Sequence, residues 1–385
     1  MIQELSITDL KVGHFVIKIA KQKGKYHLTH ADYIKSDLVI KNLIAKGVES
    51  VMVDLEKSKL AKTSTTTKKK SIIADVYEAK KLFDESKEIQ RKVFADAVNG
   101  RPLDLEAITA ITESTLKEIF RNSDALACVI NIRNKDDYLL EHSVSVSVLI
   151  TIFAKYLQID KHIVKQLAIG GFLHDVGKIM IPEEVLNKPD KLTVEEFELM
   201  KSHVVHSIDT IKATPGISDI SLEVAALHHE KLDGKGYPYN IPGDQISKYG
   251  RIIAICDIFD ALTAARCYKD GYDHGKAFGI LRSLVEKNHL DGPLVESFIN
   301  CMGAYPLGSL VELNSRKIAF VEQHNRQEPS KPVVKSFYNA ASKEYYDDVQ
   351  LIDLSVENDY IVKGVSADEL SLDMNKVIEF LLKQG

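Results

Sequence analysis

The chain of 385 residues has only four cysteines, and none of them stands in a Cys-x-x-Cys pair. They are Cys128, Cys256, Cys267 and Cys301, all within apolar or helix-like stretches. This spacing excludes the dense disulfide framework of small secreted proteins and favours a reducing compartment. We therefore expect a cytoplasmic protein.

Long apolar runs are also missing. The longest extends from Val144 to Phe153, well short of the roughly 20 residues that cross a bilayer as a helix. The N-terminus lacks the charged stretch and following apolar stretch of a secretory signal. We expect no membrane insertion.

An excess of basic charge is absent as well. The formal net charge is −5, with 27% charged and 45% hydrophobic residues, which is ordinary for a soluble globular protein. Nothing global therefore predicts a polymeric nucleic acid as partner, and local Lys and Arg residues would have to bind any substrate phosphate. The length exceeds that of one usual domain and predicts at least two.

The pattern of apolar residues divides the chain into three parts. Residues 1–125 predict a small α/β domain with a flexible polar loop at 61–70 (AKTSTTTKKK), followed by two helices that break near residues 99–102. Helical spacing dominates residues 126–305, whereas residues 306–385 predict short strands and a last helix. The expected fold is mainly α, with a small α/β N-terminal domain and a short β-rich C-terminal extension.

Several helices of the middle part are predicted with particular features. Residues 142–157 are apolar nearly all round, which is typical of a central buried helix. Thr193 and Glu196 have the spacing of a capping box and predict a helix start. Residues 252–265 and 277–285 predict two further amphipathic helices.

The predicted helices carry seven residues of the types that bind divalent metals. They are His142, His174, Asp175, His203, His228, His229 and Asp257. Each residue alone favours a structural role, and a His pair can simply complement a helix C-terminus. Together, however, they would be costly to bury unless something satisfied them. Imidazole and carboxylate groups suit iron, manganese and zinc, and a pair of such ions can activate water for attack on phosphorus.

Three sequence blocks make this pattern specific: FLHDVGK at 172–178, HHEKLDGKGYP at 228–238 and DIFDALTAARCYK at 257–269. They resemble the hallmark blocks of HD-GYP domains, which belong to the HD hydrolase superfamily. The resemblance covers about residues 137–303. The flanks resemble, more weakly, an N-terminal accessory domain and a β-rich tail that often accompany such domains.

The resemblance implies an all-helical domain around a non-haem centre of two or three metals, commonly iron or manganese. It implies hydrolysis of cyclic di-GMP, or of a related cyclic dinucleotide such as cyclic GMP-AMP, to the linear form. It also implies that the seven residues are the metal ligands and that Asp175 bridges two ions.

The same resemblance suggests further catalytic and substrate-binding residues. Lys178 lies four residues after His174, which is one helical turn, and its ammonium would reach a metal-bound phosphate. Arg266 and Lys269, near the end of the helix that carries Asp257, suit phosphate binding, although without the motif they would indicate only exposed cations at a helix end. Asp260 would orient the nucleophilic water or a guanine.

The second block ends in a turn-rich loop that contains Gly234, Gly236, Tyr237 and Pro238. Glycine and proline fix a backbone shape rather than perform chemistry. We expect this loop to form a wall of the site or to dock a partner, such as a diguanylate cyclase or another signalling protein.

The number of metal ions is expected to be two. Some HD-GYP proteins hold a third ion with a glutamate one helical turn before the first His ligand, and here that position is Tyr138. A phenol, with an ordinary pKa of about 10, is a poor ligand at neutral pH. Glu141 directly precedes His142 and should therefore point about 100° away from it.

Two other functions stay open at this point. One is a different HD-type metal phosphohydrolase that acts on nucleotides or phosphate monoesters, against which the phosphate-binding block argues. The other is a non-catalytic sensor that binds the dinucleotide, against which the complete set of ligands argues.

Overall fold

The computed structural model describes residues 2–24, 28, 31–34, 37–55, 57–58, 72–131, 138–264, 271–325, 327–367 and 369–384. The chain forms two compact units, Met1–Lys69 and Lys70–Gly385. The predicted polar loop at 61–70 and the predicted phosphate ligands Arg266 and Lys269 lie outside the described residues.

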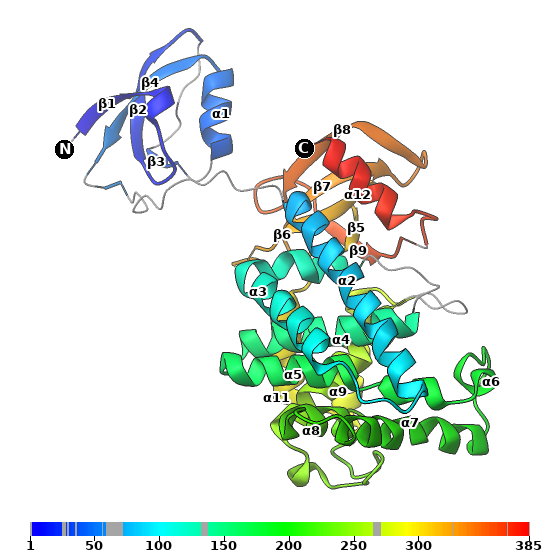
Figure 1. The fold of residues 1–385 in the computed structure, drawn as a ribbon. Helices are drawn as coiled ribbons and strands as arrows, with labels where there is room; N and C mark the ends of the chain where they lie inside the picture. Colours follow the sequence, from blue (N-terminus) through cyan, green and yellow to red (C-terminus); the bar gives the residue numbers. More distant parts are fainter. Residues whose placement is uncertain are drawn as a thin grey trace. The chain divides into compact units, whose positions relative to one another are not determined.

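The first unit is an antiparallel sheet with one helix (Figure 1). Its elements are β1 (Ile2–Ser6), β2 (Phe15–Gln22), β3 (Asp32–Tyr33), α1 (Asp37–Ala45) and β4 (Val48–Asp54), and the strand order is β1-β4-β2-β3. The inner strand β4 buries Val51 and Val53, which alternate along it and form a core with Val16 of β2. This confirms the predicted small α/β domain.

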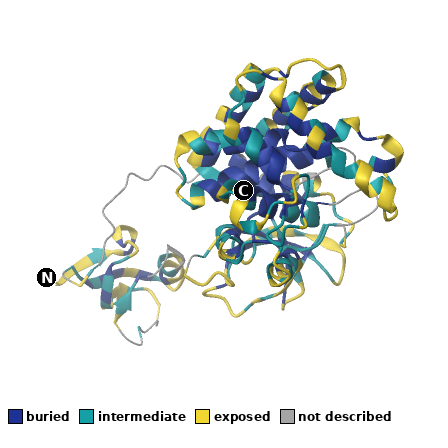
Figure 2. Ribbon diagram, turned by 90° about the horizontal axis from the view of Figure 1, so that it is seen from below, coloured by how far each residue is buried: buried dark blue, intermediate teal, exposed yellow. Residues whose placement is uncertain are grey.

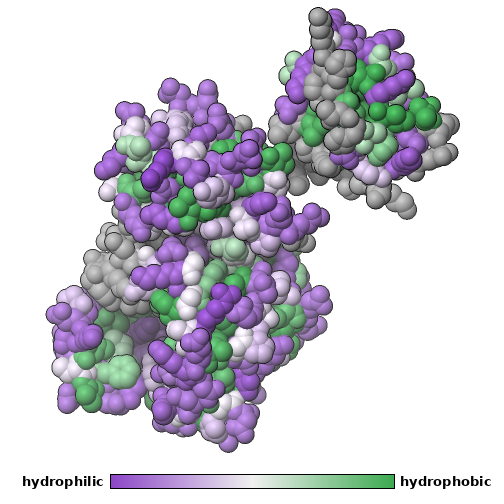
Figure 3. All heavy atoms as spheres, turned by 180° about the vertical axis from the view of Figure 1, so that it is seen from behind, coloured by the Kyte–Doolittle hydropathy of each residue, from purple (hydrophilic) through white to green (hydrophobic). Residues whose placement is uncertain are grey.

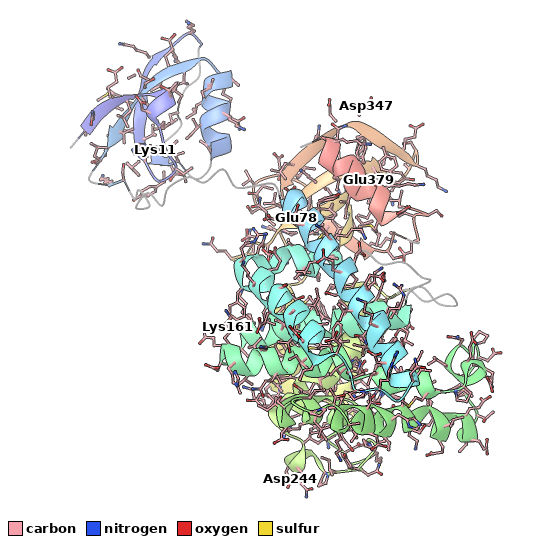
Figure 4. All side chains as sticks on the ribbon, viewed as in Figure 1. Lys11, Glu78, Lys161, Asp244, Asp347 and Glu379 are labelled. Carbon is pink, nitrogen blue, oxygen red and sulfur yellow. The ribbon has the colours of Figure 1, made fainter. Side chains whose placement is uncertain are left out.

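The second unit is built mainly from helices (Figure 1). These are α2 (Ile72–Val98), α3 (Leu105–Val129), α4 (Tyr138–Tyr156), α5 (Lys161–Leu173), α6 (Glu183–Leu186), α7 (Val194–Lys212), α8 (Asp219–Leu227), α9 (Lys248–Thr263), α10 (His274–Glu286), α11 (Gly292–Met302) and α12 (Met374–Lys383). Two 3-10 turns, η3 (Val176–Met180) and η4 (Gly243–Gln245), lie between them. Charged residues such as Lys161 and Asp244 lie at the periphery (Figure 4).

Helix α4 is the centre of this unit. Every residue from Glu141 to Ala154 is buried, and α4 packs against α2, α3, α5, α9 and α11. Figure 2 shows the buried interior of the helical part. By length and composition α4 could cross a membrane, but 78% of its apolar window is buried within the protein. It is therefore a core helix, as its sequence predicted.

Polar side chains cap the helices that surround α4. Asp160, Ser218, Ser247 and Asp273 accept backbone N–H groups at the starts of α5, α8, α9 and α10. The predicted capping box at the start of α7 is confirmed: the Thr193 side chain accepts the Glu196 N–H, and the Glu196 side chain accepts the Thr193 N–H. These caps fix where each helix begins and hence where its ligands lie.

An antiparallel sheet completes the second unit and confirms the predicted β-rich extension. Its strands are β5 (Leu310–Leu313), β6 (Lys317–Gln323), β7 (Val333–Asn339), β8 (Glu344–Asp353) and β9 (Ile361–Val365), in the order β8-β7-β6-β5-β9. Successive residues of β6 face opposite sides: Phe320 joins the helical core, while Ala319 and Val321 join a separate core of the sheet.

The boundary between the units differs from the predicted domain boundary at residues 125 and 126. That point falls inside α3, which packs against α2, α4 and α5. The chain is instead divided into its two compact units between residues 69 and 70. Helices α2 and α3 therefore lie with the helical body in space, although their pattern in the sequence continues that of the N-terminal part.

Candidate metal centre

The seven predicted ligands come from five helices and converge in the interior of the second unit. They are His142 on α4, His174 and Asp175 directly after α5, His203 on α7, His228 and His229 directly after α8, and Asp257 on α9. Six of them are buried, whereas the side chain of His229 keeps 24% of its surface exposed. The centre therefore opens to solvent at His229.

The first group of ligands consists of His142, His174 and Asp175, whose ligand atoms lie within 4.8 Å of one another. Asp175 Oδ2 is 3.1 Å from His142 Nε2 and 3.3 Å from His174 Nε2. Asp257 Oδ1 is 3.0 Å from His142 Nε2 and 3.7 Å from His174 Nε2. Two imidazoles and two carboxylates therefore face one point.

The second group consists of His203, His228 and His229, again with ligand atoms within 4.8 Å of one another. The Nε2 atoms of His203 and His228 are 3.4 Å apart. Asp175 Oδ1 lies 3.3 Å from His203 Nε2 and 3.7 Å from His228 Nε2. Asp257 Oδ2 lies 3.8 Å from His229 Nδ1. Each of the two carboxylates thus directs one oxygen at the first group and its other oxygen at the second group.

The second ring nitrogen of each buried histidine has its own acceptor. The Nδ1 atoms of His174, His203 and His228 are 2.7, 2.6 and 2.6 Å from the carbonyl oxygens of Gly171, Met200 and Ala225, each three residues earlier. His142 Nδ1 is 2.7 Å from Asp260 Oδ2. Such bonds leave Nε2 with its lone pair directed at the shared centre, as in metal-binding histidines.

The unsatisfied atoms of the site fit metal ions. His142 Nε2, His174 Nε2 and Asp175 Oδ1 are buried and have no hydrogen-bond partner among the described residues. Buried polar atoms are normally paired, so a bound cation is the natural partner for these three. The donor set of imidazole and carboxylate suits iron, manganese or zinc.

The protonation of the second group also fits metal binding. Burial, together with the neighbouring His229, holds the pKa of His228 well below its ordinary value. Burial also lowers the pKa of His229 to about 3. Burial alone would raise the pKa of Asp175, but neighbouring His174 and Lys178 hold it well below the ordinary value. Near neutral pH the side chains of His228 and His229 are thus neutral imidazoles and that of Asp175 is a carboxylate, the forms that bind metals.

Lys178 lies beside the centre, although not in the way the sequence predicted. Helix α5 ends at Leu173, and Lys178 belongs to the 3-10 turn η3, so the predicted helical turn leading to it is wrong. Its Nζ is nevertheless 2.5 Å from Asp175 Oδ2. The turn is tight because Gly177 meets α7: a Cβ there would lie 2.1 Å from the His203 carbonyl oxygen.

Asp260 lies on the far side of His142 from the other ligands. Its side chain is fully buried and bonds to His142 Nδ1. The direct contact with water or guanine that the sequence suggested has no support in this position. Helix α9 ends at Thr263, and Ala264 has extended backbone angles. The predicted helix to residue 265 is therefore slightly too long.

Comparison with known protein families decides the assignment of the helical body. Residues 128–294 match the HD domain family. This match assigns the helical body, rather than the whole chain, to the HD domain family. Residues 2–108 match a domain of unknown function, and residues 310–372 match a KOW domain that is associated with HD domains. The HD domain thus contains all seven converging residues.

Curated relatives of this HD-domain chain are named phosphodiesterases. A cyclic di-GMP phosphodiesterase of Pseudomonas aeruginosa is 33% identical over 70% of this chain and 64% of its own length. A 3'3'-cGAMP-specific phosphodiesterase of Vibrio cholerae is 34% identical over 51% of this chain and 45% of its own length. The chain therefore spans less than two thirds of the length of these relatives.

Among solved structures, an HDG"Y"P protein from Bdellovibrio bacteriovorus aligns with 77% of this chain and 98% of its own chain. The sequence identity is 16% and the TM-score is 0.49. A likeness at this level carries no argument, so the family assignment rests on the sequence matches.

The turn-rich loop of the HD domain lies against the second group of ligands. The Tyr237 ring centroid is 4.6 Å from that of His229, and the Tyr237 N–H donates to the His229 carbonyl at 3.2 Å. Gly234 has φ +72°, and a Cβ on Gly236 would lie 2.4 Å from Glu230 Cα. Pro238 follows a cis peptide bond. The loop thus packs over the exposed edge of the centre.

The sequence analysis did not predict the roles of three residues in this region, Glu230, Phe197 and Lys201. Glu230 is buried, and its Oε1 accepts the N–H groups of Tyr239 and Asn240, which closes the loop. Phe197 and Lys201 of α7 pack on Tyr237. Only for Glu230 did the sequence offer a signal. It is an acidic residue directly after the His pair, and a charged residue in a buried block needs a local partner.

Proposed function

We propose that this chain is a metal-dependent phosphodiesterase that hydrolyses a cyclic dinucleotide to the linear dinucleotide. The substrate would be cyclic di-GMP or a related molecule such as cyclic GMP-AMP. The supporting observation is that two groups of histidines face the same two carboxylates, those of Asp175 and Asp257. The names of the curated relatives support the substrate class.

The seven converging residues would hold two divalent ions, iron or manganese. When bound, such a pair would supply an activated water and positive charge for in-line attack on phosphorus. Asp175 and Asp257 would join the two positions, and the three backbone carbonyls behind His174, His203 and His228 would keep their Nε2 atoms directed inward.

Two other residues would act beside the ligands. Lys178, with only 18% of its side chain exposed, would offer its ammonium to a substrate phosphate oxygen, where a partly desolvated charge is strongest. Asp260 would act as a positioning residue, because it accepts the Nδ1 proton of His142. Arg266 and Lys269 remain proposed phosphate ligands on the basis of the sequence motif.

The cellular setting is proposed as well. Cys128, Cys256 and Cys301 are free, which agrees with a reducing cytoplasm. A diguanylate cyclase or another signalling protein stays a predicted partner of the loop around Tyr237.

A hydrolysis assay tests the proposal. Protein purified without oxygen is loaded with iron or manganese and incubated with cyclic di-GMP, cyclic GMP-AMP and cyclic di-AMP, and the products are separated by chromatography. We expect a linear dinucleotide from at least one guanine-containing substrate and none from chelator-treated protein. Tight binding without cleavage would favour the sensor, and cleavage of phosphate monoesters alone would favour a different phosphohydrolase.

A further inference from the structure

A lysine and two aromatic rings lie together at the exposed edge of the centre. The Lys201 Nζ is 5.4 Å from the ring centroid of Phe197 and 5.9 Å from that of Tyr237. The two rings are 6.3 Å apart and nearly perpendicular, with an interplanar angle of 85°. We call these three residues the aromatic wall.

The aromatic wall continues directly from the ligands. The Tyr237 ring is 4.6 Å from His229 and 6.4 Å from His203, and His229 is the ligand with an exposed side chain. Figure 3 shows a recess in the helical body beside the lobe that carries α6 and the start of α7. Phe197 and Lys201 lie in the first half of α7, and both contact Tyr237, which in turn packs on His229. The wall therefore borders the partly exposed edge of the centre.

The exposure of the wall suits a planar ligand. Phe197 keeps 46% of its surface exposed, so its ring is accessible to a ligand. Exposed aromatic faces beside a phosphate site are where nucleobases stack. A cyclic dinucleotide whose phosphate lies at the metal centre would carry a base on each side of it.

The lysine adds a preference for one base. Lys201 pairs with Glu198 at 2.6 Å, and the Glu198 side chain is 63% exposed, so this ion pair is weak and screened. The Lys201 ammonium therefore has further hydrogen bonds to donate beside the rings. Guanine presents two acceptors, O6 and N7, to a lysine, whereas adenine presents a donor at the place of O6.

We propose that Phe197, Tyr237 and Lys201 form the subsite for one guanine base of the substrate. Phe197 stacks the base, Tyr237 contacts the edge of the base because the two rings are nearly perpendicular, and Lys201 donates to its O6 and N7. The subsite rests on the proposed function, because it assigns a base to the substrate of that reaction. It predicts that cyclic di-GMP and cyclic GMP-AMP bind better than cyclic di-AMP.

A comparison of two substrates tests the subsite. Phe197→Ala, Lys201→Met and a control, Val205→Ala, are assayed with cyclic di-GMP and with bis(p-nitrophenyl) phosphate, a phosphodiester without a base. Val205 is on the same helix and 44% exposed. We expect Phe197→Ala and Lys201→Met to raise KM for cyclic di-GMP roughly tenfold, with little change in kcat. The kcat for the small diester and the metal content should stay at wild-type values, whereas KM for this diester can change because its nitrophenyl rings can also stack on Phe197.

Other outcomes would overturn the subsite. Equal losses on both substrates, or loss of metal, would mean that the wall only holds the loop onto α7. An unchanged KM for cyclic di-GMP would exclude contact with the base. If the wild-type protein cleaves neither substrate, the proposed function fails, and calorimetric binding of cyclic di-GMP then decides the subsite. Weaker binding to Phe197→Ala would support it, and equal binding would exclude it.

Discussion

Asp175 faces both groups of histidines and the ammonium of Lys178. Because one carboxylate serves two positions, Asp175→Ala should reduce the bound metal and lower hydrolysis to background while the helical fold persists. Metal analysis, circular dichroism and the hydrolysis assay check this expectation. Asp209→Ala, an exposed acid on α7, is the matched control. Turnover at the wild-type rate in Asp175→Ala would refute the bridging role.

Asp260 acts through His142 in our account, and its replacement should show this. Loss of the acceptor for His142 Nδ1 should weaken metal affinity or activity by about 10–100-fold. Asp260→Asn should be less affected than Asp260→Ala, because its amide oxygen still accepts the proton. A metal titration of each variant is the measurement. Full metal affinity with a raised KM would instead return Asp260 to the substrate contact that the sequence suggested.

Lys178 and Arg266 are expected to affect different kinetic constants. Lys178→Ala should mainly lower kcat, because its ammonium lies beside the bridging carboxylate and so closest to the reacting phosphate. Arg266→Ala should mainly raise KM, because it removes binding that is equal in the ground state and the transition state. Steady-state kinetics of both variants distinguish the two effects, and the opposite pattern would exchange the two roles.

At the scale of elements, α2 supports the centre although it precedes the residues that match the HD domain. It packs against α4 and η3, and its Lys87 Nζ lies 3.0 Å from Glu141 Oε1, with 11% and 4% of the two side chains exposed. Lys87→Met leaves Glu141 buried without this cation and should lower the free energy of unfolding by about 3–5 kcal/mol.

Denaturant unfolding of Lys87→Met measures the effect. Lys92→Met, an exposed lysine on the same helix, is the control and should unfold like the wild type. The double variant Lys87→Met with Glu141→Gln should recover part of the loss, because the buried carboxylate charge is then removed together with the cation. Equal stability of all variants would show that α2 packs without this ion pair.

The sequence predicted the elements with a buried stripe and missed those without one. Helices α2 and α7 have a regular apolar stripe, and α4 is apolar nearly all round. Helices α4 and α9 lie within a few residues of the predicted ranges, and α7 begins at the predicted cap. Strands β1 and β8 were not predicted, because they are edge strands that are exposed along most of their length. Such strands lack the alternation of buried and exposed residues on which the prediction depends.

At the scale of the whole molecule, the motif identified the residues of the centre but not its geometry. Asp257 lies between both groups of ligands, and Asp260 bonds to the Nδ1 atom of His142. Both positions depend on how α9 packs against α4, which spacing along the chain does not determine. The aromatic wall likewise joins α7 to a loop that is far from it in sequence. Residue types follow from local patterns, whereas contacts between helices require the packed core.

The number of ions is the central claim about the assembled centre. The resemblance to HD-GYP domains predicts that the acidic ligand of a third ion would lie at position 138. Here Tyr138 stacks its ring on His142 at 5.6 Å with an interplanar angle of 19°. Glu141 pairs with Lys87. The described residues offer two groups of ligands joined by Asp175 and Asp257, which is enough for a two-metal mechanism.

Anomalous X-ray scattering from crystals of the fully metal-loaded protein tests this claim most directly. The account predicts two peaks, one at His142 and His174 and one at His203, His228 and His229, with Asp175 between them. Three fully occupied ions, or a single ion held without Asp175, would contradict it.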